Sequence, residues 1–330
     1  MTSKRTNGEP RLSDLGEREI IRKLASEFPT GGFIPPGDDC GAIEIDERLI
    51  LLSTDSKADD THFPKGFTPF DKGWSIAAAN LSDVAAMGGI PLGFLIAYGL
   101  PRDTPFSVLH DIEAGIDSCL ADHSVQIIKA DTKENKVLTL AGTAVGVVDK
   151  AEVLRRKGSR PGDAVCVTGS LGGSALGLRS LKEKLGIAAA EERFRRPTPR
   201  IKEGRMLAKS GVATSCMDIS DGLSSSLHEL MRASGNGFEI DADHLPLHPS
   251  LSESEIQGDD AIVLGLNSGD EYELLFTVRQ EGLMGLRATF KAGENSGFAE
   301  IGRVIEKKAI VLMKGRSSEP LPDKGYEHFR

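Results

Sequence analysis

The chain has 330 residues, of which 39% are hydrophobic and 27% charged, and its formal net charge is −9. This composition is typical of a soluble globular protein with room for two domains and sizeable cores. The acidic balance argues against a general nucleic-acid binder, which would need basic surface to neutralise phosphates. The four cysteines form no CxxC pair. Neither a zinc site nor a disulfide framework is therefore expected, and a reducing cytoplasm fits.

The polar N-terminal segment, residues 1–14, has no apolar run of the kind that marks a signal peptide, and we expect it to be flexible. A first domain is expected over residues 15–149 and a second over residues 150–330. The chain is expected to pass from one to the other in KAEVLRRKGSRPGD, residues 150–163. Strand-like and helix-like segments are read in both, so each is expected to be a mixed α/β domain.

The first candidate ligands stand beside apolar strands. Asp38 and Asp39 lie in a turn rich in proline and glycine (IPPGDDC), just before a strand-like run. The next strand, Leu49–Leu52, ends in the triplet STD, residues 53–55. Each of these turns, taken alone, is an ordinary turn, because aspartate and serine favour turns for local reasons.

The segment NLSDVAAMGGIPLGFLIAYGLP, residues 80–101, places Asp83 at the head of eighteen uncharged residues. That length approaches a membrane span, but glycines and a proline interrupt its centre. A helix that ends before a glycine explains these glycines and the proline better. We therefore predict a helix over Lys72–Met87 and a buried strand over Leu92–Leu100. The helix is apolar nearly all round, which predicts burial on two sides. A buried Asp83 then needs a partner or a metal ion.

The apolar strands Leu49–Leu52 and Leu92–Leu100 look too hydrophobic for an exposed sheet edge. A partner is therefore expected to cover one of them, which predicts a homodimer through the first domain.

Further along, VQIIKADTKEN is predicted as a strand that ends at Asp131. The glycine cluster VTGSLGGSALGL, residues 167–178, is read as strand, tight turn and helix, with a packing turn favoured over a loop that contacts phosphate. Residues 179–196 are predicted as one helix, which the two prolines of RRPTPR then break. Residues 244–260 are expected to form a surface connection.

The segment GVATSCMDISDGLSSSLHELMRASG is predicted as a strand, then Asp218 and Asp221, then a helix that ends at Gly235. Four strands thus meet aspartate or hydroxyl residues at their ends. Short oxygen ligands of this kind suit Mg²⁺, which is bound by a few carboxylates together with waters and phosphate oxygens. The repetition predicts a convergent acidic site. A P-loop, a protein-kinase motif set, a GxSxG elbow and an HExxH helix are all missing from the sequence.

Short motifs recur in an order that resembles the thiamine-monophosphate kinase family, from about Asp14 to Phe329. They are GDDC, STD, THF, NLSDVAAMGG, ADT, RPGD, RPTPR, DISDGL, SGDEYELLF and KGYEHF. NLSDVAAMGG with DISDGL is specific for the wider superfamily of aminoimidazole ribonucleotide synthetase-like enzymes. THF after the STD strand and the GYEHF tail point to this member. The resemblance implies a two-domain α+β fold whose N-terminal domains bind ATP and Mg²⁺ and pair in a homodimer.

The resemblance further implies ATP-dependent phosphorylation of thiamine monophosphate to thiamine diphosphate with several Mg²⁺ ions, in the cytoplasm and without a membrane or nucleic-acid partner. No catalytic general base is expected, because a phosphate acceptor with a second pKa near ~6 is already ionised. The metal ligands implied are Asp39, Ser53, Thr54, Asp55, Asp83, Asp131, Asp218 and Asp221. The nucleotide contacts implied are Ala130, Asp131, Arg156 and Ser220, and the substrate contacts are His62, Asp270 and Tyr326.

Three motifs depart from the family pattern. KADT stands where GGDT is usual, so Lys129 either supplies charge or points to solvent. SGDE replaces GGED, which leaves Asp270 as an aspartate where glutamate is typical. KADDTHF replaces VEGVHF and adds Asp59 and Asp60, which are expected to lie in a solvated loop rather than to act as ligands.

Two alternatives to the kinase stay open. One is another enzyme of the superfamily, either selenophosphate synthetase or the hydrogenase maturation protein that dehydrates a carbamoyl group. The first normally has a reactive cysteine or selenocysteine in a glycine-rich N-terminal segment and the second a terminal cysteine, and this sequence shows neither. The other is a non-catalytic regulator that binds nucleotide or metal. Metal-dependent release of ADP only when substrate is present would separate catalysis from binding.

Overall fold

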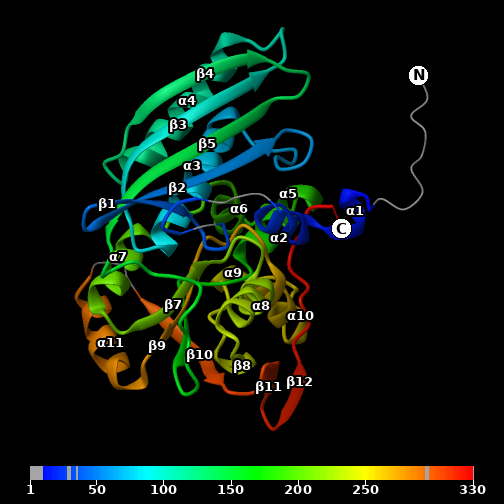
Figure 1. The fold of residues 1–330 in the computed structure, drawn as a ribbon. Coiled ribbons are helices and arrows are strands. Elements are labelled where there is room, and N and C mark those ends of the chain that lie inside the picture. Colours follow the sequence, from blue (N-terminus) through cyan, green and yellow to red (C-terminus); the bar gives the residue numbers. More distant parts are fainter. Residues whose placement is uncertain (1–9, 28–30, 35, 294–296, 330) are drawn as a thin grey trace.

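The computed structural model describes residues 10–27, 31–34, 36–293 and 297–329. Figure 1 shows an N-terminal sheet with its helices at one end and a second sheet with its helices at the other. The predicted mixed α/β architecture of two domains is confirmed. Of the segment predicted to be flexible, residues 1–9 lie outside the described residues, and the short helix α1 (Leu12–Leu15) begins within the rest. Helix α2 (Glu17–Glu27) follows.

The N-terminal sheet has the strand order β1–β2–β5–β3–β4. Its strands are β1 (Gly41–Ile45), β2 (Arg48–Ala58), β3 (Ile90–Leu100), β4 (Ile127–Glu134) and β5 (Thr139–Asp149). Strands β3 and β4 pair in parallel through the crossover helix α4 (Phe106–Ala121), and the other neighbours in this sheet are antiparallel. Helix α3 (Pro69–Ala86) and helix α4 lie against the same face of the sheet (Figure 1).

Helix α3 begins at a capping box in which the Thr68 hydroxyl accepts from the Asp71 N–H at 3.2 Å, with Pro69 at the first helical position. Paired glycines let α3 and α4 approach closely. A Cβ on Gly73 would lie 1.9 Å from the Ile112 carbonyl oxygen, and one on Gly115 would lie 2.0 Å from the Phe70 carbonyl oxygen. Any larger residue at either glycine would therefore push the two helices apart.

The opposite side of α3 packs on the C-terminal domain. A Cβ on Gly204 of helix α7 (Ile201–Ser210) would lie only 2.1 Å from the Ala85 carbonyl oxygen. One buried core contains Leu81 of α3, Leu207 of α7 and Phe276 of the second sheet. The prediction that this helix is buried on two sides is confirmed. No helix among the described residues is long and apolar enough to cross a membrane.

The C-terminal sheet has the order β12–β11–β8–β10–β6–β9–β7. Its strands are β6 (Ala164–Thr168), β7 (Ala213–Asp218), β8 (Gly237–Asp241), β9 (Leu274–Val278), β10 (Phe298–Ile305), β11 (Ile310–Lys314) and β12 (Ser317–Pro320). The other helices of this domain are α5 (Gly173–Glu183), α6 (Ala188–Arg195), α8 (Leu223–Ser234), α9 (Pro249–Ser252), α10 (Asp259–Asn267) and α11 (Leu283–Ala292), with 3₁₀ turns at Ala242–His244 and Gln280–Gly282.

Several predicted boundaries differ from the structure. The single helix predicted over 179–196 is wrong, because Lys184 takes a left-handed φ of 59° and caps α5 before α6 begins. The strand predicted over Leu49–Leu52 continues to Ala58 in β2, and the strand predicted to end at Asp131 continues to Glu134 in β4. The connection 244–260 contains helix α9, which buries Leu251.

The sheet-edge argument for a dimer is also wrong, because β2 and β3 are both interior strands. The outer face of the sheet, away from α3 and α4, is nevertheless apolar. It exposes Ile43, Ile45, Leu52, Ile90, Leu92 and Ile128. We refer to these six side chains as the outer apolar face.

Candidate active site

Three carboxylates from distant parts of the sequence meet between the two domains. Asp39 precedes β1, Asp83 lies on α3 and Asp218 ends β7, and one oxygen of each lies within 4.8 Å of the others. Hydroxyls hold two of them. Ser53 on β2 donates to Asp83, and Ser82 donates to Asp218 at 2.8 Å. The convergent acidic site predicted from separate turns is therefore present for these members.

Burial and mutual repulsion make this carboxylate cluster hard to ionise. Burial raises the pKa of Asp218 to about 8, and repulsion from Asp39 adds to the shift. Burial also raises the pKa of Asp83 well above its usual value, and repulsion from Asp55, Asp218 and Asp39 reinforces it. Asp55 lies two residues beyond Ser53 on the same face of β2, and its pKa is raised chiefly by burial. The surroundings thus compensate the ionised form of the cluster poorly, and a bound cation would favour its ionisation.

The donor set fits a hard divalent cation. Asp39 Oδ1 accepts from the Arg156 guanidinium at 2.6 Å, whereas its Oδ2 is buried and has no hydrogen-bond partner. A buried, unpartnered carboxylate oxygen is costly unless a cation or a water molecule binds it. Carboxylate and hydroxyl oxygens gathered in this way are typical Mg²⁺ ligands.

Thr54 and Asp131 do not join this cluster within one chain. Successive side chains on a strand point to opposite faces, so Thr54 lies on the outer side of β2, where its hydroxyl donates to the Gly142 carbonyl at 2.9 Å. Asp131 is exposed on β4, in register with the exposed Ala97, and a hydrogen bond with Lys133 lowers its pKa. Ala130 and Lys129 are exposed on the same strand. The nucleotide and metal roles implied for Ala130, Thr54 and Asp131 stay predictions.

The predicted nucleotide contact Arg156 reaches the acidic cluster, where it pairs with Asp39. Its neighbour Arg155 binds Asp38 at 2.7 Å, and the Asp38 carboxylate also accepts from the Arg156 N–H at 2.7 Å. Asp38 therefore anchors the segment that carries Arg156. Ser220 is exposed in the loop after β7, and its carbonyl accepts from the Asp270 N–H at 2.7 Å.

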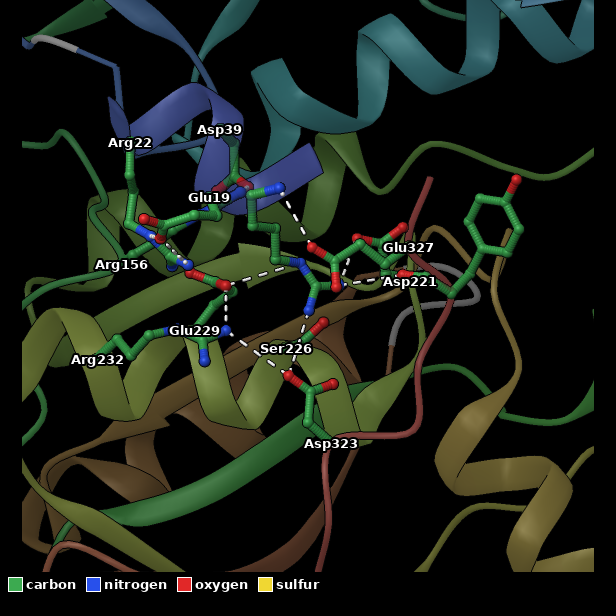
Figure 2. A network of polar contacts seen from close by, with 12 residues as sticks. Glu19, Arg22, Asp39, Arg156, Asp221, Ser226, Glu229, Arg232, Asp323 and Glu327 are labelled. Atoms are coloured by element: carbon green, nitrogen blue, oxygen red, sulfur yellow. Dashed lines mark hydrogen bonds and ion pairs between the residues drawn. The ribbon is translucent and has the colours of Figure 1, made fainter. Parts of the chain in front are cut away.

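Asp221 lies three residues after Asp218, in the loop between β7 and α8, and pairs with an arginine that the sequence analysis did not single out. Arg18 of α2 donates to Asp221 Oδ2 at 2.9 Å. The Arg18 guanidinium also lies 3.7 Å from Glu229 and 3.3 Å from Asp323, and Figure 2 labels the three carboxylates. The Asp221 carboxylate thus already has a positively charged partner in the structure.

The predicted substrate contacts His62, Asp270 and Tyr326 lie in one region at the end of β2. The His62 ring centroid is 5.2 Å from that of His328, and His328 is 4.9 Å from Tyr326. The Ala58 N–H donates to His62 Nδ1 at 3.2 Å, which assigns the ring proton to Nε2. Burial lowers the pKa of His62, and the neighbouring Lys57 and His328 lower it further, so the ring is neutral at pH 7.

A buried lysine fixes Asp270. Lys57 Nζ on β2 donates to Ser75 Oγ at 2.8 Å and to the Tyr272 hydroxyl oxygen at 3.0 Å, and lies 3.4 Å from Asp270 Oδ1. Tyr272 donates to the same carboxylate oxygen at 2.7 Å. Burial opposes ionisation of Asp270, but Lys57 and Tyr272 outweigh it and lower the pKa of the carboxyl. Asp270 is therefore an ionised acceptor facing His62.

The backbone at Asp270 is held in a conformation that side-chain-bearing residues seldom adopt. Asp270 has φ 55° and Tyr272 has φ 51°. Such strain persists where the surroundings fix it, commonly at functional sites. Glu271, between them, accepts from the Gly172 N–H at 2.7 Å and from the Ser174 N–H at 3.3 Å. The glycine cluster 167–178 therefore binds a carboxylate of its own chain at the start of α5, which supports the packing turn rather than a phosphate loop.

A second buried network, centred on Glu273, holds the loop that carries Asp270. Glu273, fully buried, accepts from Arg200 at 2.6 Å with both oxygens, from Arg193 at 2.7 Å and from Thr168 at 2.7 Å. Arg193 also donates to the Glu271 carbonyl oxygen. A Cβ on Gly169 would lie 2.1 Å from Glu273 Oε1, so glycine is required for this approach. Arg200 of the RPTPR motif and Arg193 of α6 thus help to hold the SGDEYE loop, residues 268–273.

Sequence reasoning missed Arg18, Lys57 and His328. Lys57 follows Ser53 and Asp55 at a spacing of two, so reading β2 as a longer strand would have placed it on the same face. His328 lies two residues after Tyr326 in the tail motif. Nothing in the sequence around Arg18 indicates its contact with Asp221, which is 203 positions away along the chain.

Both domains of the chain are similar to known proteins. The chain matches the family described as "AIR synthase related protein, N-terminal domain" over residues 37–148 and the corresponding C-terminal domain over residues 160–314. A solved structure described as "AaThiL complexed with AMPPCP and TMP" is 30% identical, with a TM-score of 0.84, and the match covers 98% of this chain and 100% of that one. The hydrogenase maturation protein HypE of Escherichia coli has a TM-score of 0.71 at 21% identity, which shows a shared fold alone.

Curated relatives are similar over almost the whole length. The thiamine-monophosphate kinase of Pyrococcus horikoshii is 34% identical over 97% of this chain and 98% of its own. The enzyme of the same name from Escherichia coli K12 is 34% identical over 89% of this chain and 91% of its own. Similarity at this level over both domains is that of a family member, and the chain belongs to the thiamine-monophosphate kinase family.

Proposed function

We propose that this protein transfers the γ-phosphoryl group of ATP to the phosphate of thiamine monophosphate, giving thiamine diphosphate and ADP. The observation that carries the proposal is that the acidic cluster, Asp39, Asp83 and Asp218, lies in the same part of the molecule as the group His62, Asp270 and Tyr326. Relatives that are similar over nearly the full length are named thiamine-monophosphate kinases, and a solved relative is complexed with AMPPCP and TMP. The four cysteines are free and buried, in keeping with a cytoplasmic enzyme.

Asp39, Asp83 and Asp218 would hold Mg²⁺, with Asp55 and Ser53 beside them. A bound divalent cation would offset the negative charge that two phosphate groups bring together. Arg156, next to Asp39, supplies a fixed positive charge at the same place. Lys57 keeps Asp270 ionised, and His62 presents Nε2–H as a donor toward the substrate region.

The chemistry we propose is a direct in-line displacement. An ionised oxygen of the acceptor phosphate attacks the γ-phosphorus of ATP, the bond from that phosphorus to the bridging oxygen breaks, and ADP leaves with the electron pair. The acceptor needs no general base because its second pKa is near ~6. The chain's contribution is then positioning and charge compensation.

The proposed function is tested by supplying ATP, Mg²⁺ and a set of acceptors to the purified chain and following products by ³¹P NMR. Thiamine monophosphate should be consumed, with unphosphorylated thiamine a poor acceptor. The rate should rise with acceptor ionisation and level off above about pH 7. ATP made chiral at the γ-phosphorus should give inversion. Net retention, or a trapped phosphohistidine or phosphoaspartate, would overturn the direct mechanism.

His62→Ala should mainly raise KM for thiamine monophosphate and leave kcat nearly unchanged. His62 would orient the substrate and carries no proton to or from the reacting atoms, so its loss weakens binding in the ground state and the transition state alike. Steady-state kinetics with saturating ATP measure the split. His244→Ala, at an exposed histidine in the 3₁₀ turn after β8, is the matched control. A large fall in kcat at unchanged KM would contradict the orienting role.

We also propose a homodimer in which the outer apolar faces of two chains meet. Isolated apolar side chains are normal on a protein surface, but six exposed on one sheet face favour association. Thr54 and Asp131 point to this side of the sheet. A partner on this face would therefore bring both residues into the interface.

Leu92→Glu should convert the dimer to a monomer without unfolding it. Leu92 is 53% exposed in one chain, so a carboxylate there stays solvated in the monomer. In the dimer it would be buried without a partner, which destabilises the interface. Sedimentation equilibrium at micromolar concentration should give twice the 35.3 kDa chain mass for the wild type and the single chain mass for the variant. Met284→Glu, at an 84% exposed site on α11, should remain dimeric. A wild-type chain that sediments only as a monomer would refute the dimer.

A further inference from the structure

Helix α2 is attached to the rest of the molecule mainly through polar contacts. None of its eleven residues is buried. The Arg18 side chain, by contrast, is 15% exposed and lies against the C-terminal domain. Its backbone N–H also donates to Glu327 at 3.3 Å, and the neighbouring Glu17 N–H donates to the His328 carbonyl oxygen at 3.2 Å. Arg18 is therefore the main anchor of α2.

One guanidinium joins three carboxylates from different segments. Arg18 lies 2.9 Å from Asp221, 3.3 Å from Asp323 and 3.7 Å from Glu229. Arg232 shares Glu229 and approaches Asp323 at 3.7 Å (Figure 2). Arg156 also attracts Asp221 and Glu229 electrostatically, so Asp221 lies in a network of guanidinium groups that a bound divalent ion would disturb.

The same arginine holds the C-terminal tail across the substrate region. Arg18 donates to the Tyr326 carbonyl oxygen at 3.1 Å, and the Tyr326 N–H donates to the Asp221 carbonyl oxygen at 3.0 Å. A Cβ on Gly325 would lie 2.3 Å from that Asp221 oxygen, so the tail passes in direct contact with the loop. Tyr326 and His328 are thereby placed beside His62.

We propose that Arg18 is a positioning residue. It pairs with Asp221 when no metal ion is bound and releases that carboxylate when a divalent ion binds. The inference rests on the proposed function and on the metal role that the family resemblance implies for Asp221. A guanidinium and a divalent ion at one carboxylate repel each other, so binding of the ion weakens the Arg18 contact. Release of Arg18 loosens α2 and the tail together. Metal occupancy is thus coupled to the tail that places Tyr326 and His328 beside His62.

The coupling is tested on the full chain with Mn²⁺ as the probe and no nucleotide present. Hydrogen exchange in the wild type should become faster in 17–27 and 323–328 when Mn²⁺ is added. In Arg18→Gln both segments should exchange fast without Mn²⁺. The variant should bind Mn²⁺ about twofold to fivefold more tightly by titration with EPR detection, the range that a partly exposed ion pair contributes. Arg18→Lys keeps the charge and should restore most of the wild-type affinity and protection.

Arg22→Gln is the matched control, because Arg22 lies one turn further along α2 and pairs with Glu19 on the surface. It should leave Mn²⁺ affinity and tail exchange unchanged. Asp323→Asn covers the case in which Arg18→Gln does not fold, since it keeps the Arg18–Asp221 pair. It should loosen the tail while changing Mn²⁺ affinity less than twofold. Equal or weaker Mn²⁺ binding by Arg18→Gln, or unchanged exchange on adding Mn²⁺ to the wild type, would overturn the proposal.

These readouts separate the inference from the proposed function. A chain that phosphorylates no acceptor but shows the Mn²⁺-dependent exchange would retain the inference and lose the kinase. A chain that is an active kinase without any change in exchange would retain the function and lose the coupling. In the active enzyme, Arg18→Gln should also lower the Mg²⁺ concentration that gives half-maximal rate, which a purely structural role would not do.

Discussion

Replacement of Asp83 by asparagine is expected to lower kcat by about 10²-fold or more, the range seen when one electrostatic contact to the transition state is lost. The change keeps the side-chain volume and removes the charge that would help to hold a divalent cation. Steady-state kinetics across a range of Mg²⁺ concentrations measure it. Asp117→Asn, at an exposed position on α4, is the matched control and should be fully active.

The same variant should be at least as stable as the wild type when no metal is present. Burial and repulsion raise the pKa of Asp83 in the folded chain above the ordinary value near ~4. Its favourable contribution is therefore complete below that ordinary pKa and is lost as the pH rises through the folded pKa. The stability difference in favour of Asp83→Asn should grow with pH when unfolding is followed in EDTA. A variant that unfolds more easily at every pH, yet retains turnover, would remove Asp83 from the metal site.

Glu273→Gln is expected to cost about 3–5 kcal/mol of unfolding free energy, the range for breaking a buried ion pair. The glutamine leaves Arg193 and Arg200 without their shared carboxylate, and its amide N–H₂ faces the donors of two guanidinium groups. Urea unfolding followed by circular dichroism measures the loss. Because Arg193 also binds the Glu271 carbonyl, KM for thiamine monophosphate should rise as the Asp270 loop is displaced.

Glu183→Gln offers a matched comparison for this effect. Glu183 pairs with Arg179 one turn away on α5, and both side chains are about half exposed. The expected loss is only about 0.5 kcal/mol, because solvent screens the pair. If the two glutamine variants lost similar amounts, the buried network would not be what holds the loop in its strained conformation.

Apolar patterning predicted the elements that have an ordinary core. The helix predicted over Lys72–Met87 is α3, which spans Pro69–Ala86. Gly88 follows its end with a positive φ, as the glycines there indicated. The prediction of β2 stopped at Leu52 because the inward-facing positions then become Ser53, Asp55 and Lys57. A strand lined with polar ligands has no hydrophobic alternation, so its pattern looks like that of a loop.

Side-chain direction along β2 was missed, and long-range contacts were the part that the sequence could not supply. The STD triplet was read as one set of ligands, but strand geometry sends Thr54 to the outer face while Ser53 and Asp55 point inward. The motif match named Asp131 and Asp221 alike, yet only the fold shows one exposed on β4 and the other bound to Arg18. Alternation along β2 alone separates Thr54 from its neighbours, whereas the Asp221 contact depends on how α2 packs on the C-terminal domain, which short motifs do not encode.

The position of α3 between the two sheets has a consequence for how the molecule comes apart. Its residues belong to one apolar core together with residues of α7 and β9, so neither half can lose its structure without exposing the side chains of the other. Two recurring family domains are thereby fused into a single cooperative unit. Calorimetry should record one melting transition, and cutting the chain within 150–163 should yield two fragments that remain associated instead of two independently stable modules.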